Sequence, residues 1–325
     1  MLFEITHVIR FTYNRPVLLE PHAIRLRPRT DIFQRLVSFE LAIDPRPEAI
    51  SEVVDAAGNG VINVWFLGLW PVLVIRASCT VETLRPNPFD YIVLDPEGLR
   101  IPMIYGESDR RMLAPYLDPP SDVSVASFAG DVLQSSPGGA TAFLHELCSR
   151  IHRSIAHEER RVGNALPAAE TLARGRGACR DRAVLFVEAC RAVGLGARFV
   201  TGYEIGNPGA GARDLHAWGE VYLNGAGWRG YDPSQGLAVA DHHVALCVGP
   251  GPAEAAPTTG TFRGTNVGST LTAAISVRVP TSGSSSVNTG FAPSRPRPVS
   301  SSIPRGAAVS SLPAQVSELP KPPPP

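Results

Sequence analysis

Residues 216–232 constrain the fold most, because their pattern predicts a β-hairpin with a single register. Apolar and polar residues alternate from His216 to Leu223, an Asn-Gly-Ala-Gly turn follows, and a second short strand ends at Asp232. A three-residue loop pairs Leu223 with Gly227. In this register Asp232 lies on the same sheet face as His216, diagonal to it and within side-chain reach. A shift of one residue would place the two side chains on opposite faces.

A cysteine stands at the expected start of a helix. Cys179 follows the sequence Gly-Arg-Gly-Ala, and a largely apolar helical pattern then runs from Ala183 to Gly194, a typical C-terminal cap. The free N–H groups and the positive dipole end at a helix N-terminus favour the thiolate, which is the nucleophilic form of cysteine. Three of the other cysteines are expected to be small core side chains instead: Cys148, Cys190 and Cys247.

Together the helix and the hairpin predict a Cys–His–Asp site. Cys179 would attack a substrate, His216 would accept its proton, and Asp232 would fix the tautomer of the imidazole. The order of the three residues, with the cysteine on a helix and the other two on a hairpin, matches the papain-like arrangement. The chemistry that these residue types support is attack of a thiolate on a carbonyl group.

Three more side chains are candidates for the lining of the cleft. Asp181 either orients the loop before the cysteine or caps the helix through backbone amides, and capping is the better interpretation. Trp218 and Tyr222 alternate with His216 on one strand face, so each of them either lines the cleft or has a plain packing role.

Two pairs of histidines could suggest a metal site. His145 and His152 lie seven residues apart on one predicted helix, but no third ligand completes a set. His242 and His243 are adjacent on a predicted strand, where neighbouring side chains point to opposite faces. We therefore expect no metal, and we expect one member of the second pair to be buried and the other exposed.

Residues 1–85 predict an antiparallel β module with short loops. The apolar run from Val61 to Ile75 has 15 residues and contains Asn63 and Pro71, so it is shorter than the about 20 residues that span a bilayer. Two packed strands that separate at residues 69–71 explain this run better. Alternation places further strands at residues 3–11, 24–27 and 36–43, with a turn at residues 55–60.

The rest of the chain divides by composition. Residues 86–137 are rich in proline and show little periodicity, which predicts an irregular connecting segment. A catalytic domain over residues 138–280 begins with a helix that opens near Thr141. Residues 281–325 hold 11 Ser and 10 Pro, a composition that predicts a disordered tail. The prolines of the tail suit a spacer, and docking of a protein partner stays an open alternative.

Composition also excludes several functions. Lys321 is the only lysine, whereas phosphate-binding loops, Schiff-base enzymes and protein kinases need a lysine in an ordered segment. Lys and Arg together number 30, as do Asp and Glu, so the surplus of cations that nucleic-acid binding needs is missing. The five cysteines form no CxxC pair and are expected to be free thiols. With no evident signal peptide or membrane span, we expect a soluble, cytoplasmic protein without membrane contact.

Four motifs make the chain resemble the bacterial transglutaminase-like superfamily. They are Gly-Arg-Gly-x-Cys-Arg-Asp at residues 175–181, Gly-x-x-Ala-Arg-Phe-Val-x-Gly-Tyr at 194–203, Asp-x-His-Ala-Trp-x-Glu-Val-Tyr at 214–222, and Gly-Trp-x-Gly-x-Asp-Pro at 227–233. The first 82 residues, which include His-x-x-x-Phe-x-Tyr at 7–13, are similar to the β module that often precedes such domains. The resemblance covers residues 1–279 and departs at Gly249–Pro252, where relatives commonly have Gly-Arg-Asp.

The resemblance implies an α+β protein: an N-terminal antiparallel β module, a papain-like, transglutaminase-like catalytic domain and a disordered tail. It implies a thiol enzyme that needs no cofactor and forms an acyl-enzyme on a peptide or protein amide substrate. Hydrolysis by a peptidase or amidase is favoured over transfer to an amine by a protein-glutamine transamidase. One oxyanion donor would be the backbone N–H of Cys179. A non-catalytic module that binds a peptide or a partner is the alternative, although such a module does not need all three residues of the triad.

Overall fold

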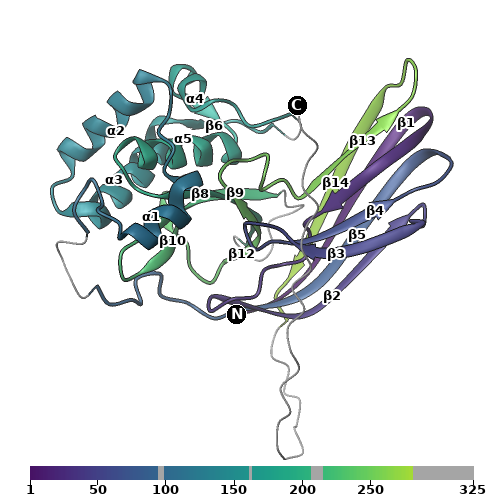
Figure 1. Cartoon of the computed structure of the whole chain (residues 1–325), viewed down its shortest axis with the longest axis horizontal. Helices are drawn as coiled ribbons and strands as arrows, with labels where there is room; N and C mark the ends of the chain where they lie inside the picture. Colours follow the sequence, from purple (N-terminus) through teal and green to yellow (C-terminus); the bar gives the residue numbers. More distant parts are fainter. Residues whose placement is uncertain (94–98, 161–162, 206–214, 281–325) are drawn as a thin grey trace, which may run out of the picture. The chain divides into compact units, whose positions relative to one another are not determined.

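The computed structural model describes residues 1–93, 99–160, 163–205 and 215–280, and the predicted tail over residues 281–325 lies outside them. Residues Met1–Thr281 form one compact unit. This unit is an α+β structure with two antiparallel sheets and a group of helices, as predicted (Figure 1). Within the described residues, no helix is both long and apolar enough to cross a membrane.

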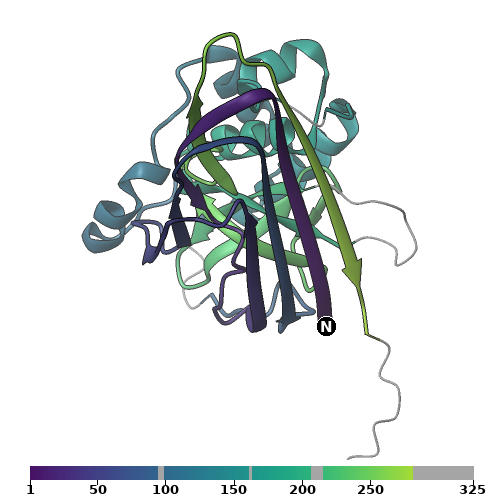
Figure 2. The same ribbon diagram turned by 90° about the vertical axis from the view of Figure 1, so that its right-hand side faces the viewer.

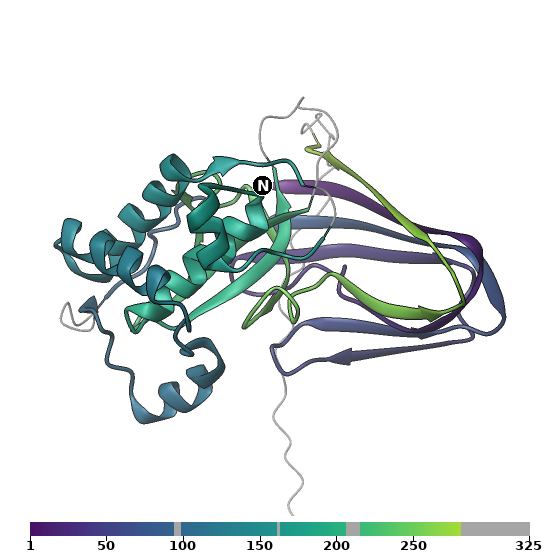
Figure 3. The same ribbon diagram turned by 90° about the horizontal axis from the view of Figure 1, so that it is seen from above.

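The first sheet is built around one long strand, β1 (Leu2–Ile24), which pairs with other strands along both of its edges. The core order is β2-β5-β1-β4-β3, and two late strands also pair with β1. Figure 3 shows these long strands side by side from above. Their bounds are β2 (Gln34–Asp44), β3 (Ala49–Val54), β4 (Gly60–Trp65), β5 (Leu69–Thr83), β13 (Thr258–Arg263) and β14 (Ser269–Arg278).

Alternation explains which face of this sheet is buried. Phe3 and Ile5 of β1 and Leu73 and Ile75 of β5 are almost fully buried, and the residues between them point to the other face. The apolar run divides three residues earlier than predicted, at residues 66–68. Gly68 has a φ of +85°, a conformation that favours glycine, so the turn forms there.

Two late strands differ from the expectation that the catalytic domain contains all of residues 138–280. β14 pairs with β1 from Glu4 to Tyr13, and β13 pairs with the second half of β1 (Figure 2). Both strands therefore complete the N-terminal sheet. Their alternating sequence predicts strands, but local alternation carries no information about which sheet a strand joins.

The prediction of an irregular segment over residues 86–137 is wrong for residues 107–135. These residues contain helices α1 (Glu107–Leu113) and α2 (Val123–Ser135) and the short 3₁₀ turn η2 (Ala114–Tyr116). In α2 the Asp122 side chain accepts a hydrogen bond from the Ser124 N–H at the N-terminus, and Val125, Ala129 and Val132 are buried. Serine, valine and glycine lower the intrinsic helix propensity of α2, so its packing against the other helices decides the structure.

The second sheet has the order β11-β10-β9-β8-β12, and helices pack on one of its faces. Helix α5 (Cys179–Ala192) contacts β9 closely, because a Cβ at Gly219 would lie only 2.4 Å from the Phe186 ring. The strands are β8 (Ala197–Glu204), β9 (His216–Leu223), β10 (Gly227–Asp232), β11 (Leu237–Ala238) and β12 (His243–Gly249). The remaining elements are α3 (Gly139–Ser154), α4 (Ala168–Arg174) and the parallel pair β6 (Ala156–His157) and β7 (Arg176–Gly177).

Two buried carboxamides cover the outer edge of the second sheet. Gln34 accepts a hydrogen bond from the N–H of Ala245 at 2.8 Å and donates to its carbonyl at 2.9 Å. Asn59 makes the same double contact with Val248, at 2.8 Å in each direction. Each side chain thus binds β12 as a neighbouring strand would, and the first sheet holds this edge in place.

A histidine and a tyrosine also join the two sheets. Nδ1 of His7 lies 3.1 Å from the hydroxyl of Tyr203, and both side chains are buried. Burial lowers the pKa of His7 to about 4. His7 is therefore neutral at physiological pH and serves the packing between the sheets.

Candidate active site

Cys179 is the first residue of α5, as predicted from the glycines before it and the apolar pattern after it. Its Sγ lies 3.8 Å from the carbonyl oxygen of Leu215, the residue before β9. Cys179 is partly exposed, whereas the other four cysteines are buried. A reagent or a substrate can therefore reach this thiol more readily than the other four.

Burial also makes the four remaining thiols hard to ionise. It raises the pKa of Cys79 and of Cys247 to about 12, and it raises the pKa of Cys148 and Cys190 as well. The prediction that Cys148, Cys190 and Cys247 are core side chains is confirmed.

The hairpin has the predicted register. Leu223 pairs with Gly227, and the pairing continues to Tyr231 opposite Gly219. Nε2 of His216 lies 2.7 Å from Oδ2 of Asp232, which is completely buried. The other carboxylate oxygen, Oδ1, accepts hydrogen bonds from two backbone N–H groups of the following turn, those of Ser234 at 2.8 Å and Gln235 at 3.3 Å.

These contacts set the protonation of the pair. Burial alone would lower the pKa of His216, but its hydrogen bonds with Asp232 and Cys179 and the charges of both outweigh burial and raise the pKa to about 10. Burial alone would raise the pKa of Asp232, but hydrogen bonds from His216 and His243 hold it well below its usual range. Because Nε2 of His216 is bound to Asp232, Nδ1 is the ring nitrogen left for Cys179. A protonated imidazole is thus poised beside the thiol.

His243, the first residue of β12, also contacts Asp232, and no local sequence pattern indicates this contact. Its Nε2 lies 3.0 Å from the same Oδ2 that binds His216, and the residue is only 7% exposed. The adjacent His242 has an exposed side chain. The prediction that one histidine of this pair is buried and the other exposed is therefore confirmed, but alternation alone did not indicate the partner of the buried one.

A glycine on β8 brings the distant strands together. A Cβ at Gly202 would lie 2.6 Å from the Trp218 ring and 2.2 Å from the carbonyl oxygen of Val244. The indole can therefore lie across β8, where it stacks on His216 (6.3 Å, 30°) and meets His243 edge-on (5.2 Å, 75°). Trp218 is buried and supports the two histidines.

The other two candidates for the cleft have different roles. Tyr222 packs edge-on against Trp228 at 5.4 Å, and it lies six residues beyond His216, which is about 20 Å along a strand. The structure therefore does not bring it to the triad. The buried carboxylate of Asp181 accepts the Ala178 N–H and the Leu166 N–H, both at 2.8 Å, and pairs with the Arg160 guanidinium. Asp181 thus caps α5, as predicted, and also fixes the loop before Cys179.

The loop at Gly249–Pro252 is held by helix α5. Arg191 near the end of α5 donates a hydrogen bond to the carbonyl oxygen of Pro250 at 2.5 Å. A Cβ at Gly249 would lie 2.6 Å from the Cβ of Glu254, so the loop folds tightly on itself. The loop departs from the motif of the family that the chain resembles, and its contact with Arg191 gives it a structural role.

One group of described side chains is compact enough to hold a metal ion: His216, Asp232 and His243, whose ligand atoms lie within 4.8 Å of one another. The hydrogen bonds of 2.7 and 3.0 Å account for these separations. Hydrogen bonds from the two histidines to Asp232 therefore explain why the three side chains lie so close together.

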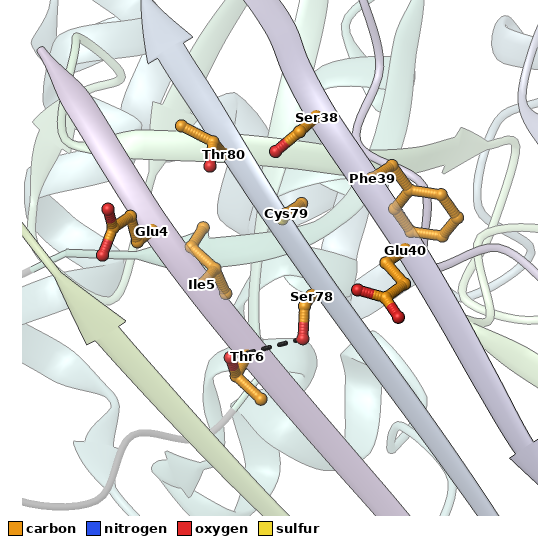
Figure 4. Close-up of a pocket in the computed structure, with 9 residues that line it drawn as sticks. All are labelled: Glu4, Ile5, Thr6, Ser38, Phe39, Glu40, Ser78, Cys79 and Thr80. Carbon is orange, nitrogen blue, oxygen red and sulfur yellow. Dashed lines mark hydrogen bonds between the residues drawn. The ribbon is translucent and has the colours of Figure 1, made fainter.

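A shallow depression on the first sheet has no comparable chemistry (Figure 4). It lies over β1, β2 and β5, and no histidine lines it. Its lining residues are Glu4, Ile5, Thr6, Ser38, Phe39, Glu40, Ser78, Cys79 and Thr80. Cys79 is the one thiol there, and it is a buried group with a raised pKa.

Comparisons with known proteins show two family matches. Residues 3–82 match the bacterial transglutaminase-like N-terminal region, and residues 128–233 match the transglutaminase-like superfamily. The second match contains Cys179, His216 and Asp232.

Relatives of similar length have been found in mycobacteria. An uncharacterized protein of Mycobacterium tuberculosis, Rv2569c, is 27% identical over 261 residues, which cover 75% of this chain and 82% of that protein. An uncharacterized protein of Mycobacterium leprae, ML0607, is 22% identical over 272 residues, which cover 80% and 93%.

The fold also matches a solved structure. A protein from Cytophaga hutchinsonii, described as a "putative cysteine protease", superposes with a TM-score of 0.61 over 86% of this chain and 98% of its own. At 20% identity, this likeness shows a shared fold.

Proposed function

We propose that this chain, which belongs to the transglutaminase-like superfamily and carries its bacterial N-terminal region, cleaves amide bonds through an acyl-enzyme on Cys179. The observation that carries the proposal is the set of contacts around His216. One ring nitrogen of His216 binds the buried carboxylate of Asp232 at 2.7 Å, and Cys179, the partly exposed thiol at the start of α5, helps to raise the pKa of the same ring.

In the first half of the reaction the Cys179 thiolate attacks the amide carbonyl. The oxygen of the tetrahedral intermediate would accept a hydrogen bond from the backbone N–H of Cys179, because the first N–H groups of a helix have no partner within it. The C–N bond then breaks, the amine leaves with the proton from Nδ1 of His216, and a thioester remains on Cys179.

In the second half a water molecule attacks the thioester. His216, now neutral, takes a proton from this water through Nδ1, and the C–S bond breaks to release a carboxylic acid. The thiolate and the imidazolium are restored. Throughout, Asp232 holds the Nε2 side of the ring and stabilises its charged form.

Transfer of the acyl group to an amine uses the same thioester, so the triad alone is compatible with a transamidase. The description of the C. hutchinsonii protein as a cysteine protease favours water as the acceptor. A non-catalytic binding module is the third candidate. The intact set of Cys179, His216 and Asp232 supports an enzyme instead, since peptide binding needs none of these contacts.

Trapping of the acyl-enzyme tests the proposal. Wild-type protein incubated with cell lysate and quenched in acid should carry a thioester-linked mass on Cys179 that hydroxylamine removes. The Cys179→Ala variant should carry none. Addition of a primary amine then separates the reactions, because a hydrolase keeps forming the free acid whereas a transamidase forms the amide of the added amine. Absence of any adduct on Cys179 would overturn the catalytic proposal.

A further inference from the structure

The carboxylate of Asp232 binds two histidines, although the proposed reaction uses only one of them. Nε2 of His216 and Nε2 of His243 lie 2.7 and 3.0 Å from the same oxygen, Oδ2. Nδ1 of His243 is buried and has no hydrogen-bond partner among the described residues. Since an ionised carboxylate only accepts hydrogen bonds, Nε2 of His243 carries the proton that it shares with Asp232.

The two carboxylate oxygens of Asp232 have different hydrogen-bond partners. Oδ1 is fixed by the N–H groups of Ser234 and Gln235 in the turn after β10. Oδ2 is fixed by His243 from β12 and presents its remaining lone pair to His216. The carboxylate therefore keeps its orientation when His216 gives up and regains a proton on its other nitrogen.

His243 is itself held firmly in place. The indole of Trp218 lies edge-on to its ring at 5.2 Å. Its strand is fixed on the outer side by Gln34 and Asn59, which bind the backbone of Ala245 and Val248. The N-terminal β module thus reaches the triad through a continuous series of contacts: carboxamides, β12, His243 and Asp232.

We propose that His243 is a positioning residue, whose Nε2–H aligns Asp232 and thereby holds Nδ1 of His216 towards Cys179. The inference rests on the proposed function and names a fourth side chain for that site. His243 contacts neither the thiol nor a substrate in this role. The titratable groups with which it makes contact are Asp232 of β10 and His216 of β9.

The test uses iodoacetamide as the probe and the full-length protein. The rate of Cys179 alkylation is measured at acidic and at alkaline pH in wild type, His243→Leu, His243→Gln and the adjacent exposed control His242→Ala. We expect His243→Leu to react about tenfold more slowly at acidic pH, the effect of losing one hydrogen bond to a charged group. At alkaline pH the thiol ionises without help, so this difference should disappear.

Recovery of the alkylation rate in His243→Gln would distinguish a positioning role of His243 from a role in packing alone. The amide nitrogen of Gln can occupy the place of Nε2 and donate to Asp232, so His243→Gln should recover most of the wild-type rate, and His242→Ala should match wild type. If His243→Leu matches wild type at acidic pH, or if Gln is as slow as Leu, the inference is wrong. If the Leu variant fails to fold, the Gln variant and nitrogen NMR of the wild-type protein still test the inference. The spectrum should show two imidazole Nε2–H signals that both shift in Asp232→Asn, and a single such signal contradicts the inference.

The His216→Ala variant distinguishes this failure from failure of the proposed function. If Cys179 reacts equally in wild type and His216→Ala at acidic pH, the triad itself is not functional. If His216 matters and His243 does not, only the positioning role is lost.

Discussion

Oδ2 of Asp232 accepts a hydrogen bond from Nε2 of His216 at 2.7 Å across two neighbouring strands, at a point where the carboxylate is completely buried. A buried ionised carboxylate is stable only when donors satisfy it, and Asp232 has four such contacts. The pair is therefore a fixed part of the structure, and the orientation and the raised pKa of His216 follow from its contact with Asp232.

Replacement of Asp232 by Asn should show the effect of the carboxylate charge on catalysis separately from the effect of the side-chain shape. Asp232→Asn keeps the size of the side chain but removes the charge that favours a protonated His216. We expect amide-bond cleavage to fall by about 10²- to 10⁴-fold, the range that general acid–base catalysis supplies. Turnover of the substrate identified by acyl-enzyme trapping checks this. Asp241→Asn, a change in the connection before β12, serves as the control and should retain activity.

The shifted pKa values predict how stability depends on pH. The pKa of His216 in the folded protein, about 10, lies above that of an unfolded histidine, about 6.5. Its stabilising contribution is therefore complete below about pH 6.5 and is lost as the pH rises towards 10. The pKa of Asp232 is lowered, so its contribution is present above about pH 3.9 and is lost as the pH falls further.

Urea unfolding of wild type and Asp232→Asn checks this dependence. The difference in the free energy of unfolding should be largest between about pH 4 and pH 6.5, and it should shrink at lower pH and as the pH rises towards 10. A difference that stays constant across this range would contradict the assigned pKa shifts.

The two carboxamides that cover β12 should be important for stability. Asn59→Ala leaves the buried N–H and carbonyl of Val248 without this partner, and Gln34→Ala removes the partner of the Ala245 N–H, whose carbonyl keeps a hydrogen bond from the Arg29 N–H at 3.1 Å. We expect a loss of about 2 kcal/mol in the free energy of unfolding for each, measured by urea denaturation. Gln134→Ala, at an exposed position of α2, should change it by less than about 0.5 kcal/mol. Equal effects at all three positions would argue against the edge contact.

A methyl group at Gly202 should disturb both packing and reactivity. Gly202→Ala places a Cβ against the Trp218 ring and the Val244 carbonyl, so we expect a loss of about 1–3 kcal/mol in stability. Alkylation of Cys179 at acidic pH should also slow, because Trp218 supports His216. Gly130→Ala is the matched control: it lies inside α2 with open space around it and should be neutral or stabilising, by up to about 1 kcal/mol. Circular dichroism melts and alkylation rates of the two variants give the comparison.

Local sequence patterns are sufficient to predict the hairpin and the helix that begins at Cys179. The alternation and the turn at residues 224–226 define the register that brings His216 to Asp232. The glycines before Cys179 and the apolar pattern after it place the thiol at a helix start. Both predictions concern residues close together in sequence, where turn geometry and periodicity determine the contacts.

Contacts between distant segments could not be predicted in this way. His243 reaches Asp232 because Gly202 leaves space for Trp218, a condition that involves three strands at once. β14 closes the first sheet against β1, and α2 forms despite weak propensity because other helices bury it. No local pattern carries this information, since tertiary packing decides it.

The proposed role of His216 can be tested through the reactivity of Cys179 at acidic pH. Wild type and His216→Ala are treated with iodoacetamide at acidic pH, and alkylation of Cys179 is followed by peptide mass spectrometry, with the four buried cysteines as internal references. We expect rapid, selective alkylation of Cys179 in wild type and a decrease of at least about tenfold in the alkylation rate of His216→Ala. Equal rates in the two proteins, or alkylation of Cys179 no faster than that of the buried cysteines, would contradict the proposed role.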